Sequence, residues 1–204
     1  MIKYLKNRVR DFRKDEEGTI IAEAVVMFPL LFATVIAMFV FFDAFRHQSM
    51  SLKAAYTISD AISREGEDRS INSDYVVNLW RLHKFLSRSP SLTRLQVSLI
   101  QFDEVDGHSV VWSDERGGYG KLEQGDLDIL VSDNKVPIMP HFGSLILVQT
   151  TVNYTPAFSI GLTSFHFENT IFTSPRFSAQ LCYSENGDIA NRICPNISAP
   201  DTST

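Results

Sequence analysis

The residues best placed to do chemistry lie where a basic N-terminal segment meets an apolar one. Six basic side chains fall in the first fourteen residues, the segment ends at Gly18, and Glu23 follows five residues later. Glycine lets a backbone extend into a protease cleft, so Gly18 would suit a cleavage site if the chain is cut before Thr19. The cut would leave Thr19 with a positively charged α-amine, about one helical turn from Glu23.

Glu23 calls for a partner. A charged side chain near the start of a membrane helix is costly unless it is paired or reaches the interface. The new amine of Thr19, in the same chain or a neighbouring one, is one candidate. The alternative is a carboxylate stabilised by the helix dipole, with or without cleavage. Pro29, further into the apolar run, is either part of the junction or a tolerated membrane-helix kink.

The second reactive pair is Cys182 and Cys194, the only cysteines of the chain. A bridge between them would close a loop of about 13 residues, worth roughly 3 kcal/mol in the chain-entropy model. Export to an oxidising compartment favours this disulfide over two free thiols. A metal pair is the remaining alternative, and zinc is disfavoured because no histidine is adjacent.

Other catalytic and binding signatures are missing from the sequence. HExxH, GxSxG, Walker A and a GxGxxG after a strand are absent, and the five histidines lack metal-ligand spacing. Asp126, Asp128 and Asp133 form an acidic cluster without the terminal glutamate of an EF-hand, so a solvated loop is expected there. We therefore predict no enzyme, no cofactor and no metal. The net charge of −5 predicts no nucleic-acid partner.

The element that must position Gly18 and Glu23 is the apolar run behind them. Nineteen uncharged residues run from Ala24 to Phe42, and a bilayer core needs about 20 in a helix. The run is longer than the ~7–15 residues of a signal-peptide core; a cleaved signal and a buried soluble helix are the alternatives. Because basic residues near a span stay cytoplasmic, the N-terminus is expected inside and the rest outside. For a single-pass protein of a bacterial inner membrane, outside means the periplasm or beyond.

Beyond the span an α+β domain with an antiparallel sheet is expected, since helices precede a run of strands. The segments are a cytoplasmic leader (1–18), a transmembrane helix (19–45), its periplasmic extension (46–66), the α+β domain (67–194) and a flexible tail (195–204). The long helix should end near residue 65 with Gly66 as its C-cap. A second helix should be capped by Ser73 and ended by Pro90. His83 falls on its apolar face, as a core or half-buried histidine.

The alternation of apolar and polar residues predicts the strands of the sheet. They are expected at 95–99, 109–113, 145–154, 165–173 and 176–183. The Asp106-Gly107 pair indicates a hairpin turn between the first two.

The junction resembles that of type IV prepilins and pseudopilins. The run Asp15-Glu16-Glu17-Gly18-Thr19-Ile20-Ile21-Ala22-Glu23-Ala24, with Pro29 after it, looks more narrowly like the TadE/TadF-like proteins of tight-adherence (Tad/Flp) pilus systems, as does Ser174-Pro175-Arg176 before Cys182. The resemblance implies a membrane-anchored pseudopilin that is cut by a prepilin peptidase and helps assemble a Tad pilus for adherence or secretion. Gly18 would be the last leader residue, Thr19 the new N-terminus and Glu23 the pilin-type glutamate. The implied partners are other pilins or pseudopilins and the Tad assembly platform.

Two departures refine this expectation. Prepilins often place Phe at the first mature position, where this chain has Thr19, and the exported domain is far larger than that of a major Flp pilin. Both favour a minor component over the bulk subunit. Removing the leader takes six basic and four acidic residues, so the mature charge falls from −5 to −7. The alternative functions are an unprocessed single-span periplasmic binding or scaffold module, and a hydrolase behind an uncleaved anchor.

Overall fold

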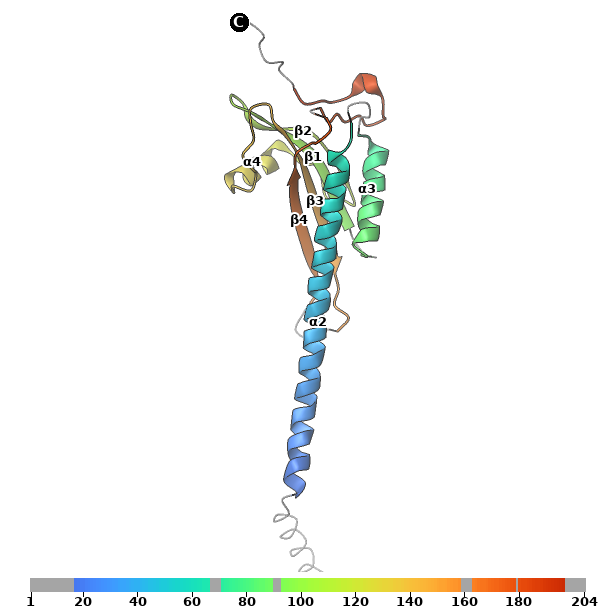
Figure 1. The fold of residues 1–204 in the computed structure, drawn as a ribbon, viewed down its shortest axis with the longest axis vertical. Helices are drawn as coiled ribbons and strands as arrows, with labels where there is room; N and C mark the ends of the chain where they lie inside the picture. The colour runs from blue at the N-terminus through green and yellow to red at the C-terminus, as the bar shows by residue number, and fades with distance from the viewer. Residues whose placement is uncertain (1–16, 67–70, 90–92, 159–162, 179, 197–204) are drawn as a thin grey trace, which may run out of the picture. The chain divides into compact units, whose positions relative to one another are not determined.

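The computed structural model describes residues 17–66, 71–89, 93–158, 163–178 and 180–196. These residues form an α+β fold (Figure 1), as the sequence predicts. Its elements are α2 (Glu17–Ser63), α3 (Ser73–Leu86), β1 (Thr93–Asp103), β2 (Gly107–Arg116), α4 (Gln124–Ser132), β3 (Ser144–Tyr154), β4 (Phe165–Thr173) and the 3₁₀ helix η1 (Ile189–Asn191). The chain divides into two compact units. One holds residues up to Ala44 with Pro156–Thr163, and the other holds Phe45–Thr155 with Ser164–Thr204.

The second unit is built on one antiparallel sheet with the strand order β2-β1-β3-β4. The β1–β2 hairpin turns at the predicted place, and Gly107 opens β2 with a φ of 78°, a left-handed conformation that glycine adopts without steric cost. Strand β3 pairs in unbroken register with β1 on one side and with β4 on the other. Four of the five predicted strands are therefore present, with β1 and β2 longer than expected.

Helices cover both faces of this sheet, which explains why β1 is buried along most of its length. The C-terminal half of α2 and helix α3 pack on one face through a core that includes Ile58, Ile62, Leu79 and Leu99. Helix α4 packs on the opposite face, where Leu127 meets Ile100 and Leu147. Side chains alternate across a strand, so neighbouring residues of β1 serve different cores.

The ends of the first two helices differ from the prediction. Helix α2 stops at Ser63, and Gly66 does not take the positive φ of the expected C-cap. The backbone N–H of Arg176 donates instead to the Ser63 carbonyl at 2.9 Å, so a distant segment satisfies the helix end. Helix α3 is capped by Asn72, whose Oδ1 accepts the Tyr75 N–H at 2.8 Å, and not by Ser73. Pro90 lies outside the described residues.

Two further predictions for the domain are wrong. The described part of 176–183 forms no strand; only Tyr183 makes isolated bridges, to Ile71 and Ile193. Its backbone bonds to a helix end and to a side chain instead of to a sheet edge. The acidic cluster is not a loop: Asp126 and Asp128 belong to α4 and Asp133 caps it, although all three are exposed. The leader up to residue 16 and the tail from 197 lie outside the described residues.

Candidate functional site

The N-terminal half of α2 presents an apolar surface that the protein itself does not bury. Its large hydrophobic side chains are mostly more than half exposed, among them Phe28 at 71% and Met38 at 76%. By length and composition this is one helix near the N-terminus able to cross a membrane. A soluble core helix would have most of this surface covered, so the exposure fits a surface meant for a hydrophobic environment.

The predicted junction residues all lie on this helix. Helix α2 already includes Gly18 and Thr19, whose side-chain surroundings lie outside the described residues. Glu23 is exposed and is the only charged residue between Ile21 and Phe42. Pro29 is exposed too, and the helix continues on both sides of it. The structure thus places Glu23 and Pro29 on one continuous helix.

Cys182 and Cys194 form a disulfide, as the sequence predicts, with Cα atoms 4.3 Å apart. The bond closes a C-terminal strap, which we define as residues 181–194. Within the strap Tyr183 and Ile193 exchange backbone hydrogen bonds of 2.8 and 2.7 Å. The strap is also tied to the α2–α3 connection, because the Ile71 N–H donates to Cys182 O and the Ser184 N–H donates to Ile71 O, each at 2.8 Å.

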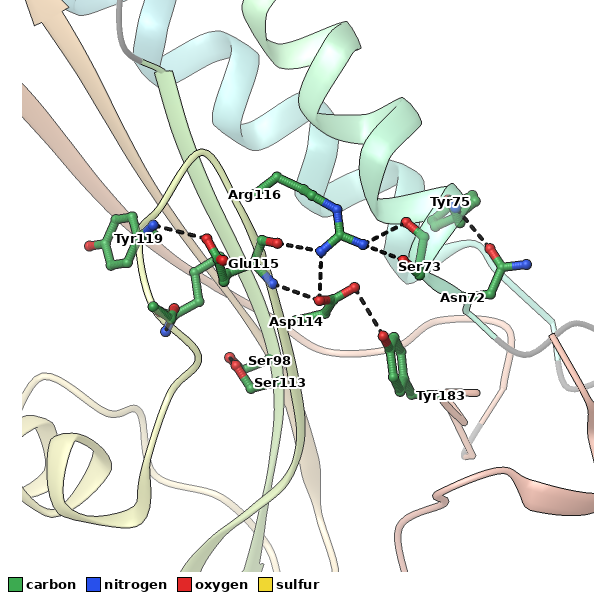
Figure 2. A network of polar contacts seen from close by, with 12 residues as sticks. Asn72, Ser73, Tyr75, Ser98, Ser113, Asp114, Glu115, Arg116, Tyr119 and Tyr183 are labelled. Carbon is green, nitrogen blue, oxygen red and sulfur yellow. Dashed lines mark hydrogen bonds and ion pairs between the residues drawn. The ribbon is translucent and has the colours of Figure 1, made fainter. Parts of the chain in front are cut away.

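A polar network joins this strap to β2 and α3 (Figure 2). Its centre is Asp114, a carboxylate only 3% exposed on the face of β2 that otherwise contributes to the core. One carboxylate oxygen accepts from Arg116 Nη1 at 2.8 Å, and the other accepts from the Tyr183 hydroxyl at 3.0 Å. Arg116 also donates through Nη2 to the carbonyl and hydroxyl oxygens of Ser73. The buried charge is therefore paired and hydrogen-bonded, the condition under which burial is tolerated.

The aromatic side of the network lies beside a surface hollow. The Trp112 and Tyr183 rings stack with centroids 5.3 Å apart, and Trp112 Nε1 donates to the Leu181 carbonyl at 2.9 Å. Burial, with the carboxylate of Asp114 adding to it, raises the pKa of the Tyr183 phenol. The hollow has a volume of about 360 Å³ and is also lined by Lys121. Because both rings are almost fully buried, they form its floor rather than an open stacking surface.

A second buried titratable group lies apart from this network. His83 is fully buried on α3, and neither ring nitrogen has a hydrogen-bond partner among the described residues. Burial lowers its pKa to about 4, so the imidazole is neutral at physiological pH. The sequence predicts the burial of His83 but not the missing partners.

The described residues hold no group of three or more His, Cys, Asp or Glu side chains able to bind a metal ion. The contacts of Asp114 and Arg116 tie the strap to β2 and α3, which indicates a structural role in fixing the strap. Sequence reasoning missed this network because its bonded partners are far apart in the sequence: Asp114 and Tyr183 are separated by 69 residues, and Ser73 and Arg116 by 43. The only local signal was a carboxylate at a core position of a strand.

Comparisons of the chain with protein-family models, with curated proteins and with solved structures returned no match.

Proposed function

We propose that this chain is a membrane-anchored minor pseudopilin, TadE-like, that takes part in assembling a Tad/Flp type IV pilus. In this proposal a prepilin peptidase removes residues 1–18, and the protein then stays in the bacterial inner membrane through α2. Its C-terminal domain lies in the periplasm, where the Cys182–Cys194 disulfide persists. Its partners are other pilins or pseudopilins and the Tad assembly platform.

The observation that carries the proposal is the division of α2 into two chemical halves. The first half exposes apolar side chains with Glu23 as the one carboxylate between Ile21 and Phe42, and the second half contributes Ile58 and Ile62 to the domain core. An anchor that is also a structural helix of the exported domain is what the resemblance to pseudopilins implies. The basic residues before Gly18 support the orientation, because they favour a cytoplasmic N-terminus.

Mass spectrometry of the N-terminus tests the processing step. The full chain is expressed with and without a prepilin peptidase, and the mature protein is expected to begin at Thr19 only when the peptidase is present. Gly18→Val should block the cut. Gly66→Val is the matched control, since a Cβ at Gly66 meets no atom within 4 Å. A protein that still begins at Met1 in the presence of active peptidase refutes the processing step.

The role of Glu23 is tested separately from membrane insertion. Glu23→Gln keeps the size of the side chain but removes the charge that would pair with the Thr19 amine. Pilus assembly is expected to fail while the amount of protein in the membrane fraction stays unchanged, and Glu23→Asp is expected to restore part of the assembly. Normal piliation in the Gln variant would contradict this role.

The alternative function, an unprocessed single-span periplasmic binding or scaffold module, makes the opposite prediction. In that case Gly18→Val changes neither the N-terminus nor the phenotype. Deletion of the gene would then leave pilus assembly intact.

A further inference from the structure

The sheet has two edges, formed by β2 and β4, and the two differ in whether their outward backbone groups are hydrogen-bonded. An edge strand carries unpaired N–H and C=O groups, and natural proteins usually cover or disrupt it. The register between β1 and β2 shifts between Leu99 and Ile100. The register between β3 and β4 is unbroken.

The β2 edge is closed by a side chain of the protein itself. The Gln124 amide nitrogen donates to the His108 carbonyl at 2.8 Å, and its oxygen accepts the Val110 N–H at 3.2 Å. One glutamine side chain thus occupies both hydrogen-bonding groups that an added strand would use at this point. Helix α4, which carries Gln124, packs beside β2.

The backbone geometry shows which groups of β4 point outward. The Phe102 N–H donates to Gly143 O at 3.0 Å, so even-numbered residues of β1 bond towards β3. Successive residues of a strand bond to opposite neighbours in an antiparallel sheet. The β1–β3 register therefore makes odd-numbered residues of β3 bond to β1 and even-numbered ones bond to β4. The β3–β4 register pairs those even-numbered residues with odd-numbered residues of β4. The N–H and C=O groups of the even-numbered residues, such as Glu168 and Thr170, therefore point away from the sheet.

No described residue donates to or accepts from these outward backbone groups. Strand β4 is nine residues long and contains no proline, lysine or bulge that would discourage pairing. Its side chains present two distinct faces at the edge. Phe165, Phe167 and Ile171 lie on the face towards α2, and Glu168 lies on the exposed opposite face.

The direction of β4 decides what can occupy this edge. Asn169 Nδ2 donates to Ser51 Oγ at 2.8 Å, and Ser59 and Thr173 share a hydroxyl hydrogen bond. From Ser51 to Ser59 the helix advances about 12 Å, and from Asn169 to Thr173 the strand advances about 13 Å. The two contacts therefore follow the same direction, and β4 runs parallel to this part of α2. Two copies pairing antiparallel through β4 would place their α2 segments in opposite directions. Chains anchored through α2 in one membrane share a direction, which excludes that pair.

We propose that the open edge of β4 binds an extended segment of a different exported polypeptide, which pairs antiparallel with Phe165–Thr173 as a fifth strand. The segment carries apolar side chains at alternate positions, against Phe167 and its neighbours, and a basic side chain opposite Glu168. The exclusion of a second copy in antiparallel pairing rests on the proposed membrane anchoring. The binding chemistry of the edge rests only on the sheet.

The probe is an acetylated and amidated peptide, Val-Thr-Val-Lys-Val-Thr-Val, with its lysine opposite Glu168 in the antiparallel register. Binding of the fluorescently labelled peptide to the full chain in detergent micelles is followed by anisotropy. Saturable binding is expected. N-methylation of its two threonines, whose N–H groups face β4, should weaken binding at least about tenfold, whereas N-methylation of the two inner valines should not.

Variants of the protein provide matched controls. Thr170→Pro removes an outward N–H without breaking a bond to β3, and it should weaken binding as much as the methylated threonines do. Thr170→Ala should bind the peptide like the wild type. Glu168→Lys should bind the lysine peptide more weakly than the wild type does, because the charge opposite the lysine is reversed. Circular dichroism checks that each variant keeps its fold.

Two results would overturn the inference. One is the absence of saturable peptide binding to the folded wild type. The other is wild-type dimers in light scattering that Thr170→Pro dissociates, which would make a second copy the occupant. Neither result bears on the cut after Gly18, so the proposed function and this inference fail independently.

Discussion

The buried imidazole of His83 makes the folded domain sensitive to mild acid. The ring is fully buried without a hydrogen-bond partner among the described residues, and burial lowers its pKa from the ordinary value of 6.5 to about 4. The unfolded chain therefore binds this proton more readily than the folded one. The contribution of His83 to the free energy of unfolding is therefore fully present above pH 6.5. It is lost as the pH drops from 6.5 to 4, and the loss levels off below about pH 4.

The size of the effect follows from the two pKa values. Each unit of difference corresponds to about 1.4 kcal/mol, so the full loss is about 3 kcal/mol. Between pH 7 and pH 5 the same linkage gives a loss of about 2 kcal/mol. A domain of ordinary stability has about 5–15 kcal/mol, so this single histidine removes a substantial share.

Urea unfolding of the full chain in detergent micelles, followed by tryptophan fluorescence, measures this loss at each pH. His83→Leu removes the titration, so wild type minus variant isolates the contribution of His83 from that of the carboxylates. This difference should change by about 2 kcal/mol between pH 7 and pH 5. His166→Asn, at an exposed histidine, is the matched control for the removal of an imidazole. A pH-independent difference between wild type and His83→Leu would refute the reasoning.

Three further predictions concern the domain and use the same unfolding assay. Asp114→Asn should lower the free energy of unfolding by about 2–4 kcal/mol, because it leaves the largely buried Arg116 without its ion pair. Asp60→Asn, at an exposed ion pair, should lower it by less than about 1 kcal/mol. Equal losses would contradict the importance of the network. Reducing the disulfide should lower stability by roughly 3 kcal/mol, and an unchanged midpoint would contradict it. Gly117→Ala should cost more than Gly118→Ala, since both glycines have positive φ but only at Gly117 would a Cβ clash with the Thr93 carbonyl oxygen. The reverse order would show that the loop shifts freely.

The sequence predicted the elements whose signals are local. The charge-free run after Glu23 predicts the exposed half of α2, and the alternation in 145–154 and 165–173 predicts β3 and β4. The disulfide followed from two cysteines and an expected oxidising compartment. In each case the physical cause, apolar burial or a covalent constraint, leaves its trace within a few residues of sequence.

The failures have non-local causes. The alternating apolar residues of 176–183 match a strand, but the backbone of this segment bonds to Ser63, Ile71 and Ile193 instead of to a strand of the sheet. Helix α4 buries a single residue, Leu127, so it shows almost no periodicity. Asp114 looks like an ordinary polar residue of a strand until Arg116 and the distant Tyr183 close around it.

The contacts between α2 and β4 connect the two proposals mechanically. Ser51 and Ser59 of α2 hydrogen-bond to β4 side chains, and Ile58 and Ile62 fix the same stretch of helix in the core. A polypeptide paired with the outer edge of β4 would therefore lie one strand away from the helix proposed to anchor the protein. Force applied to that partner would reach residues 51–62 of α2 through side-chain hydrogen bonds and core packing.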